Sequence, residues 1–219
     1  MKKKAIVTGG AGFIGSHISE LLVNKGYKVI VIDNFETGRI DNLSRIRKNI
    51  TIVRQDVANY QKIEKYFKNC QYVFHLAALA DIVPSIENPE KYYKTNVTGT
   101  LNILRASKKF GIKKVLYAAS ASCYGVVKKF PTDEKNKIIT EYPYALTKNL
   151  GEQLMTHWSK VFKLPTISLR LFNVYGLRSR TTGAYGAMFG VFLAQKINNK
   201  PLTIVGDGKQ TRDFTYVTD

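Results

Sequence analysis

The feature that most constrains the fold is a glycine-rich turn near the start of the chain, TGGAGFIGS at residues 8–16. It follows a short apolar run at 5–7 and precedes an amphipathic segment over 16–25, so it lies where a strand turns into a helix. Glycines in this context allow backbone torsions closed to other residues, and they let a pyrophosphate approach the backbone. The helix start offers N–H groups and a positive dipole end to phosphates. The turn therefore predicts a dinucleotide-binding βαβ unit.

A carboxylate closes the second predicted strand and indicates which dinucleotide is bound. This strand, over 27–33, is a nearly continuous apolar run that ends in Asp33, eighteen residues after Gly15. A carboxylate at that distance from the glycine turn is placed to bind the adenosine ribose hydroxyls. It would repel a 2′-phosphate, which predicts NAD rather than NADP. The alternative is that Asp33 and Asn34 form only a turn.

The chain alternates between predicted strands and helices over most of its length. We expect strands over 4–8, 27–33, 49–54, 72–78, 115–120 and 166–171, and helices over 12–25, 59–68, 90–109 and 144–162. Such alternation is typical of a parallel sheet covered on both faces. The sequence therefore predicts an α/β fold, a Rossmann-type doubly wound parallel sheet, with an NAD-binding domain over 1–175.

The pattern changes after Asn173. Residues 176–190 are rich in Gly, Ser, Thr and Arg and indicate a loop, followed by an expected helix over 188–199 and a short strand over 202–205. We interpret 176–219 as a partial substrate-binding domain, the start of a small C-terminal lobe. Because the pattern stops where another helix is expected, we interpret the chain as a portion of a longer enzyme.

Composition and charge indicate an ordinary enzyme with a basic surface. The net charge is +18, but the lysines are scattered over helix ends and exposed faces without interleaved aromatic residues. A nucleic-acid binder is therefore the weaker interpretation, and an attracted anionic small molecule is the other alternative. No apolar run reaches the length of about 18 residues that spans a membrane. Cys70 and Cys123 suggest neither a disulfide framework nor a metal site, so we expect no metal and a cytoplasmic protein.

Two polar residues near strand ends allow more than one interpretation. Asp56, just after the third strand, could accept a hydrogen bond from an adenine amino group, or could cap the helix near 59–68. These two roles do not exclude each other. His75, inside the fourth strand, is interpreted as a packed structural histidine rather than a base.

A serine, a tyrosine and a lysine are expected to meet at the carboxyl edge of the sheet. Ser120 and Ser122 follow the fifth strand, and Tyr144 and Lys148 lie one turn apart on the next long helix. A tyrosine titrates near pH 10, so it acts as a base near neutrality only if a fixed cation favours the phenolate. Lys148 and the positive nicotinamide of an oxidised cofactor would supply that charge, and Ser120 would hold the substrate oxygen being deprotonated.

With these residues in place, the chain resembles the extended short-chain dehydrogenase/reductase superfamily, in the branch of NAD-dependent nucleotide-sugar epimerases and dehydratases. The motifs that carry the resemblance are TGGAGFIGS at 8–16, HLAA at 75–78, NVxGT at 96–100, ASASCYG at 119–125, YPYAxxK at 142–148, RxFNVYG at 170–176 and GDGxQxRD at 206–213. They run the whole length of the chain and keep the order of the family.

The resemblance implies roles for individual residues. NAD would be bound by Gly9, Gly12, Phe13, Ile14, Asp33, Asn34, Asp56, Val57, Ala77, Ala78 and Asn96, with Tyr144 and Lys148 on the nicotinamide side. Ser120, Ser122, Asn173 and Arg212 would contact a nucleotide-diphosphate sugar, the last two at its diphosphate. The resemblance also implies a homodimer that packs the long helices near 92–108 and 144–162.

The same resemblance narrows the reaction. In 4,6-dehydratases an Asp-Glu pair follows the serine or threonine that corresponds to Ser120, and decarboxylating relatives carry a glutamate at the second of these positions. Here the two positions are Ala121 and Ser122, which have no carboxyl group. The sequence therefore favours a 4-epimerase, closest to UDP-glucose 4-epimerases, that works through a transient 4-keto sugar. A dTDP- or CDP-glucose 4,6-dehydratase or another nucleotide-sugar conversion is the alternative; a non-catalytic nucleotide-binding relative would be expected to lack Tyr144 or Lys148.

Overall fold

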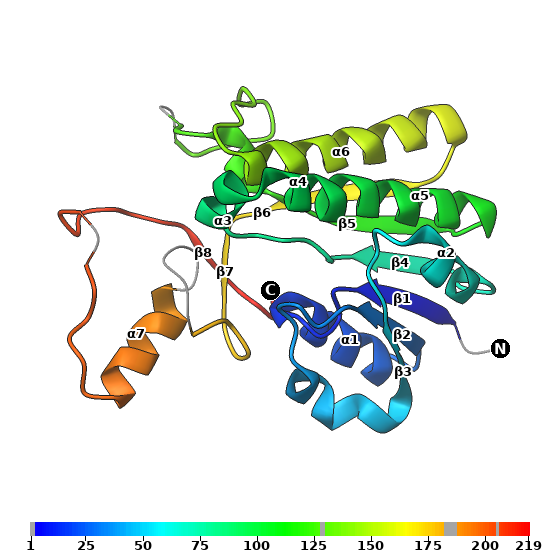
Figure 1. Cartoon of the computed structure of the whole chain (residues 1–219), viewed down its shortest axis with the longest axis horizontal. Helices are drawn as coiled ribbons and strands as arrows, with labels where there is room; N and C mark the ends of the chain where they lie inside the picture. The colour runs from blue at the N-terminus through cyan, green and yellow to red at the C-terminus, as the bar shows by residue number, and fades with distance from the viewer. Residues whose placement is uncertain (1–2, 128–129, 182–187, 205) are drawn as a thin grey trace. The chain divides into compact units, whose positions relative to one another are not determined.

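One six-stranded parallel sheet forms the centre of the larger unit of the chain, Met1–Leu171 (Figure 1). The computed structural model describes residues 3–127, 130–181, 188–204 and 206–219. In spatial order the strands are β3 (Ile50–Arg54), β2 (Lys28–Asp33), β1 (Lys4–Thr8), β4 (Tyr72–His75), β5 (Lys114–Ser120) and β6 (Thr166–Leu171). The strand order reverses between β1 and β4, the point at which such sheets bind their ligands. The predicted Rossmann-type doubly wound fold is confirmed.

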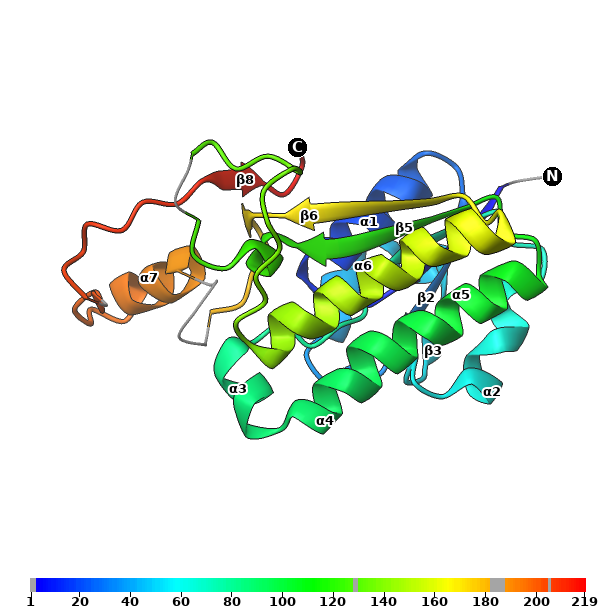
Figure 2. The same ribbon diagram turned by 90° about the horizontal axis from the view of Figure 1, so that it is seen from above.

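Helices cover both faces of this sheet. Their bounds are α1 (Phe13–Asn24), α2 (Tyr60–Ile63), α3 (Ile82–Glu87), α4 (Pro89–Tyr92), α5 (Gly99–Lys109) and α6 (Pro143–Phe162), with 3₁₀ helices η1 (Ile40–Asn49), η2 (Glu64–Phe67) and η4 (Ala121–Tyr124) and a π-helical segment η3 (Tyr93–Thr98). Helices α5 and α6 run side by side over one face, and α1 lies on the other (Figures 1 and 2). The loops that follow the strands therefore gather at one edge of the sheet, at the carboxyl ends of the strands.

The central strand β1 explains how the two layers are held. Ile6 joins one buried cluster with Ile103 of α5 and Met155 of α6. Its neighbour Val7 points to the opposite face and joins a second cluster with Leu22 of α1. Successive strand residues point to opposite faces of a sheet, so this run of apolar residues supplies both cores. Burying each such side chain contributes about 1.5–3 kcal/mol.

The helix expected over 90–109 is present as an unbroken helical run of α4, η3 and α5, in which η3 is π-helical. Two strand predictions were wrong. Strand β4 ends at His75 rather than at residue 78. After β4 the backbone leaves the ladder because the N–H of Ala77 donates to Thr8 Oγ1, at 3.3 Å. Residues 202–204 of the strand expected over 202–205 are not in a strand, and Val205 lies outside the described residues. The expected helix over 188–199 is confirmed as α7 (Met188–Ile197).

The second unit, Phe172–Asp219, contains α7 and a small parallel pair of strands. In this pair β7 (Asn173–Tyr175) lies beside β8 (Phe214–Tyr216), and the rings of Tyr175 and Phe189 have centroids 4.8 Å apart. The structure divides the chain after Leu171, whereas the sequence predicted a boundary after residue 175. None of the helices in the described ranges is both long and apolar enough to cross a membrane.

Candidate active site

The glycine turn is closed to larger side chains at both of its ends. Gly9 has a φ of 67°, and a Cβ there would lie 2.7 Å from the backbone nitrogen of Ala77. A Cβ on Gly15 would collide with the carbonyl oxygen of Gly9, so helix α1 packs directly on the turn. Gly12 is the N-cap residue of α1 and has no side chain to bond the first backbone N–H groups of the helix, which begins with Phe13 and Ile14. This cradle fits the pyrophosphate of a dinucleotide.

Asp33 lies directly against this cradle. Asp33 is 7 % exposed, and its Oδ2 accepts a hydrogen bond from the N–H of Ala11 at 2.9 Å. Oδ1 accepts from the N–H of Phe35 at 2.8 Å. Burial raises the pKa of Asp33 above its usual range, and the two backbone hydrogen bonds oppose that shift. The adjacent Asn34 is exposed and bonds to Glu36, so Asp33 is the residue of this pair that the fold holds in place.

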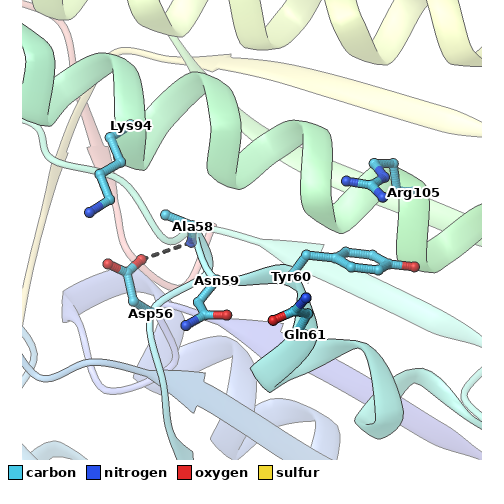
Figure 3. Close-up of a pocket in the computed structure, with 7 residues that line it drawn as sticks. All are labelled: Asp56, Ala58, Asn59, Tyr60, Gln61, Lys94 and Arg105. Atoms are coloured by element: carbon cyan, nitrogen blue, oxygen red, sulfur yellow. Dashed lines mark hydrogen bonds between the residues drawn. The ribbon is translucent and has the colours of Figure 1, made fainter.

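Asp56 lies beside a surface pocket of about 420 Å³ at the carboxyl end of β3. Figure 3 shows Asp56 and Lys94 on one side of the pocket and Tyr60 under Arg105 on the other. Asp56 Oδ1 accepts a hydrogen bond from the N–H of Ala58 at 2.8 Å, and Asn59 is the residue that precedes α2. The helix-cap interpretation of Asp56 is therefore wrong, because the carboxylate closes a tight turn before the helix begins.

The next residue, Val57, is buried and fixes this turn to helix α5. A Cβ on Gly99 would lie 2.7 Å from Val57 Cγ2, and Asn102 Nδ2 donates to the carbonyl oxygen of Val57 at 3.1 Å. The two cationic residues that line the pocket, Lys94 and Arg105, were missed by the sequence analysis. They are eleven residues apart, about three turns of a regular helix, and this spacing was the available sequence signal.

Asn96 fastens the segment after β4 to helix α6. Its Oδ1 accepts from the N–H of Leu79 at 2.8 Å, and its Nδ2 donates to Leu79 O and to Thr147 Oγ1, both at 3.0 Å. These bonds hold the segment after β4 that contains Ala77 and Ala78, and the backbone of Ala77 lies against Gly9. The structure thus gives Asn96 a structural role next to Lys148, and its cofactor contact stays a prediction.

His75 is a packed structural residue, as predicted. It is fully buried, with Nδ1 2.7 Å from Thr8 Oγ1 and Nε2 2.9 Å from Thr100 Oγ1. Burial, and to a smaller extent the charge of Lys148, lowers the pKa of His75 to about 3. The ring is therefore neutral at physiological pH and serves to join β1, β4 and α5.

The structure brings Tyr144 and Ser120 together, as predicted. The hydroxyl of Tyr144, from the first turn of α6, donates to Ser120 Oγ at the end of β5 at 3.2 Å. Ser122 completes the group, with its Oγ 2.8 Å from Ser120 Oγ and its N–H donating to the same oxygen at 3.2 Å. Two hydroxyl groups from the end of β5 and the start of η4 therefore share one site with a third from the start of α6.

Lys148 lies one helical turn after Tyr144, but its ammonium contacts Tyr117 rather than Tyr144. Its side chain is 4 % exposed, and Nζ lies 4.3 Å from the centre of the Tyr117 ring. Burial lowers the pKa of Lys148 to about 7. Burial also raises the pKa of Tyr144, while its hydrogen bonds with Ser120 and Ser122 act in the opposite direction. Burial dominates the pKa of Tyr144 in this structure, and the ammonium of Lys148 lies on Tyr117; the role of Lys148, together with the nicotinamide of an oxidised cofactor, in favouring the Tyr144 phenolate stays a prediction.

A second polar cluster, which the sequence analysis missed, fixes the elements around the site. Arg170 of β6 donates through Nε and Nη2 to both carboxylate oxygens of Glu152 on α6, at 3.0 and 2.7 Å. Its Nη1 also donates to Tyr124 Oη, at 2.8 Å, at the end of η4. The forked ion pair raises the pKa of Arg170 above its already high value. Glu152 lies on α6 one helical turn after Lys148, but its partner Arg170 comes from β6, so spacing along the helix does not indicate this pair.

The residues predicted to bind a diphosphate, Asn173 and Arg212, belong to the second unit. Asn173 Nδ2 donates to the carbonyl oxygen of Asp213 at 2.9 Å, which joins β7 to the segment before β8. Arg212 is exposed and donates to the carbonyl oxygen of Thr211. Among the residues that the structure describes, no group of three His, Cys, Asp or Glu side chains could hold a metal ion.

Comparison with known proteins agrees with this geometry. Residues 5–219 match the model of the NAD dependent epimerase/dehydratase family. A putative UDP-glucose 4-epimerase of Methanocaldococcus jannaschii is 38 % identical over 216 residues, which are 98 % of this chain and 70 % of the relative. A UDP-N-acetyl-alpha-D-glucosaminuronate decarboxylase of Bacillus cytotoxicus is 35 % identical over 224 residues, covering 100 % of this chain and 69 % of the relative.

Solved structures place the chain in the same group. A UDP-N-acetylglucosamine 4-epimerase from Methanobrevibacter ruminantium, in complex with UDP-N-acetylmuramic acid, superimposes with a TM-score of 0.94 at 37 % identity. The match covers 99 % of this chain and 70 % of that structure. Together with the glycine cradle, Asp33 and the Ser120–Tyr144 pair, these likenesses confirm the predicted superfamily and its NAD dependence. The chain belongs to the NAD-dependent epimerase/dehydratase family of extended short-chain dehydrogenases/reductases.

Proposed function

We propose that this chain carries the NAD-binding and catalytic part of a nucleotide-sugar 4-epimerase, of the UDP-glucose or UDP-N-acetylglucosamine type. The observation that supports this most is the hydrogen bond from Tyr144 Oη to Ser120 Oγ, at 3.2 Å. With this geometry Tyr144 would act as the proton acceptor and Ser120 as the hydroxyl-binding group, so that the oxygen of a secondary alcohol could be held and deprotonated between them.

The chemistry at this point begins with the 4-hydroxyl of the sugar. Without substrate, Ser120 Oγ accepts a hydrogen bond from Tyr144. With substrate, Ser120 would orient the 4-hydroxyl of the sugar, and the Tyr144 oxygen would receive the proton of this hydroxyl. NAD, held by the glycine turn and Asp33, supplies an acceptor for the hydride from C4 and returns it. The protein's part is then to keep the resulting 4-keto sugar bound while it turns over, and to give the proton back from Tyr144 to the oxygen on C4.

The charge state of Tyr144 is the main electrostatic demand of this mechanism. Burial disfavours the phenolate in this structure, so the tyrosine rests as the neutral hydroxyl that donates to Ser120. Positive charge near the ring favours the phenolate, and Lys148, one helical turn away, is the cation of this face of α6. Because burial brings the pKa of Lys148 to about 7, its charge is set by the same pH range in which the enzyme would work.

The absence of carboxyl groups next to Ser120 argues for epimerisation over the alternatives. A 4,6-dehydratase must also remove the C5 proton and protonate the C6 hydroxyl, which calls for an acid and a base beside the ketone. Here η4 offers Ala121 and Ser122, and the Ser122 hydroxyl is bonded to Ser120. Several relatives are decarboxylases, so decarboxylation is the alternative that the likenesses keep open. This chain, however, has serine at position 122, where a decarboxylase is expected to carry a glutamate.

The substrate and assembly parts of the proposal rest on the second unit and on two helices. Arg212 is a forked donor suited to phosphate oxygens, and with Asn173 it would bind the diphosphate of the nucleotide sugar. A homodimer would pack α5 and α6, which lie side by side in Figure 2, against those of a second copy. Val161 near the end of α6 is 55 % exposed, which provides apolar surface for such a contact.

Product analysis tests the proposal directly. The purified protein is incubated with NAD and, in separate reactions, with UDP-glucose, UDP-N-acetylglucosamine, dTDP-glucose and CDP-glucose, and products are identified by NMR. We expect the C4 epimer from a UDP-sugar, with no net change in NADH absorbance. A 4-keto-6-deoxy product would show a dehydratase instead, and release of CO₂ from a UDP-uronic acid would show a decarboxylase.

A further inference from the structure

Lys148 is a buried cation without an acidic partner. Its side chain is 4 % exposed, and within the described residues no carboxylate lies at ion-pair distance from its Nζ. The ionisable groups around it are His75 from β4, Tyr117 from β5, and Tyr144 and Glu152, one turn before and one turn after it on α6. Burial keeps both tyrosines protonated and His75 neutral, and the Glu152 carboxylate is paired with Arg170. Something other than an ion pair must therefore hold the ammonium.

Tyr117 contacts Lys148 at both ends of the residue. The face of its ring lies 4.3 Å from Nζ, measured to the ring centre. Its hydroxyl donates a hydrogen bond to the carbonyl oxygen of Lys148 at 3.3 Å. The ring is fully buried between strand β5 and helix α6, and it also packs on His75 with centroids 5.5 Å apart.

The helix is shaped to admit this ring. Gly151 lies on α6 directly at the Tyr117 hydroxyl, and a Cβ at this position would collide with that oxygen. A glycine inside a helix costs about 1 kcal/mol relative to alanine, so its place here has a packing reason. The absence of a side chain at Gly151 lets α6 approach β5 closely enough for Tyr117 to reach the Lys148 backbone.

We infer that Tyr117 is a positioning residue of the active site, which fixes the Lys148 ammonium with its ring and the Lys148 backbone with its hydroxyl. The negative face of an aromatic ring attracts a cation, and the attraction strengthens when water is excluded. The ring thereby offsets part of the cost of burying the charge. The consequence for turnover rests on the proposed function, but the position and protonation of Lys148 can be measured without any substrate.

The test follows the protonation of Lys148 by NMR in protein carrying ¹³C,¹⁵N-labelled lysine. The Nζ signal of Lys148 is identified by its loss in Lys148→Met, and its titration midpoint is compared among variants without NAD or sugar present. In Tyr117→Leu the ring is lost, and we expect the midpoint to fall by on the order of one pH unit. In Tyr117→Phe the ring remains, and we expect the midpoint of the unchanged protein.

Phe67→Leu is the matched control. Phe67 is fully buried in the same apolar cluster as Tyr117, but it lies on η2. Its replacement by leucine therefore removes a buried aromatic ring at a position away from Lys148. We expect the midpoint of this variant to equal that of the unchanged protein. A midpoint in Tyr117→Leu that stays in place or rises, or an equal fall in Phe67→Leu, would overturn the inference.

A second pair of variants covers the case in which Tyr117→Leu does not fold. Gly151→Ala pushes against the Tyr117 hydroxyl and should displace the ring, so we expect the Lys148 midpoint to move. Adding Tyr117→Phe removes the hydroxyl, and we expect the midpoint to return. A shift that Tyr117→Phe does not reverse, or no shift at all, contradicts a positioning role. Failure of the proposed epimerase activity would leave all these midpoints as expected, which separates the two ideas.

Discussion

The Asp33 carboxylate accepts a hydrogen bond from the Ala11 amide at 2.9 Å, which ties the end of β2 to the glycine turn. The residue that is placed to bind the cofactor's ribose therefore also holds the loop that is placed to bind its phosphates. Because the carboxylate accepts a second bond from Phe35, both of its oxygens have backbone partners before any ligand is bound. Cofactor selectivity and loop shape are linked through one side chain.

Replacing this side chain should change cofactor preference. In Asp33→Ala we expect NAD binding to weaken by about tenfold to a hundredfold, because hydrogen bonds to a charged group are lost, while NADP binding changes less. Titration of both dinucleotides, followed by fluorescence, measures the ratio of the two affinities. Asp41→Ala, which removes an exposed carboxylate of η1, is the control. An unaltered preference for NAD over NADP would remove Asp33 from the ribose site.

Tyr144→Phe should separate turnover from cofactor binding. The variant lacks only the hydroxyl that donates to Ser120, so we expect turnover to fall by about 10²–10⁴-fold with NAD affinity retained. Product formation by NMR and NAD titration are measured on the same preparation. Tyr142→Phe, a change at an exposed tyrosine two residues earlier, should keep full activity. Equal turnover in the two variants would exclude Tyr144 as the base.

Lys148 should make stability rise with pH above neutrality. Its pKa is about 7 in the folded protein against an ordinary 10.5, so between these values the unfolded chain binds more protons. The free energy of unfolding then increases with pH in this window, by up to about 1.4 kcal/mol per pH unit. Urea unfolding at several pH values compares the protein with Lys148→Met, in which we expect this rise to disappear. Lys160→Met, at an exposed position of α6, should retain it.

His75 should act in the same sense at acid pH. Its pKa is about 3 in the folded protein and 6.5 in ordinary surroundings, so stability is lost as the pH falls from 6.5 toward 3. His75→Gln keeps hydrogen-bonding groups near Thr8 and Thr100 but cannot be charged, and we expect it to flatten this acid limb. His157→Gln, at an exposed position of α6, is the comparison. Identical acid limbs in all three proteins would show that His75 is not the group being protonated.

Arg170 should be hard to replace even by lysine. Arg170→Lys loses the forked contact with Glu152, and we expect the free energy of unfolding to fall by about 2–3 kcal/mol because the pair is only about one-fifth exposed. A double-mutant cycle with Glu152→Gln measures the coupling. Arg45 and Glu20, 4.0 Å apart with the Arg45 side chain 74 % exposed, offer a control in which Arg45→Lys should have little effect. Additive losses in the cycle would contradict a direct Arg170–Glu152 contribution.

The parts of this fold that local pattern controls were predictable from the sequence. The glycine turn, the buried strands and the carboxylate at the end of β2 each follow from a few neighbouring residues, and their order along the chain determines the sheet topology. The meeting of Ser120 and Tyr144 followed as well, because strand ends and helix starts share one edge of such a sheet.

Contacts made across layers were not predictable in the same way. Nothing in the spacing of Lys148 indicates that its ammonium rests on Tyr117, since that partner comes from a neighbouring strand. The expected strand over 202–205 shows a related limit. Its alternation of apolar residues suits a strand, but β7 pairs with Phe214–Tyr216 instead, and pairing partners depend on tertiary packing.

The π-helical segment η3, Tyr93–Thr98, changes the direction in which the side chains of α4 point relative to those of α5. Each residue of an α-helix advances the facing direction by about 100°, so the extra residue of a π-type turn rotates everything before it relative to everything after it. If one residue of η3 were deleted and α5 stayed packed on the sheet, α4 would rotate about the helix axis by the angle of one residue. Asn96 would then no longer reach Leu79 and Thr147 together, and the register of this segment should tolerate substitution better than deletion.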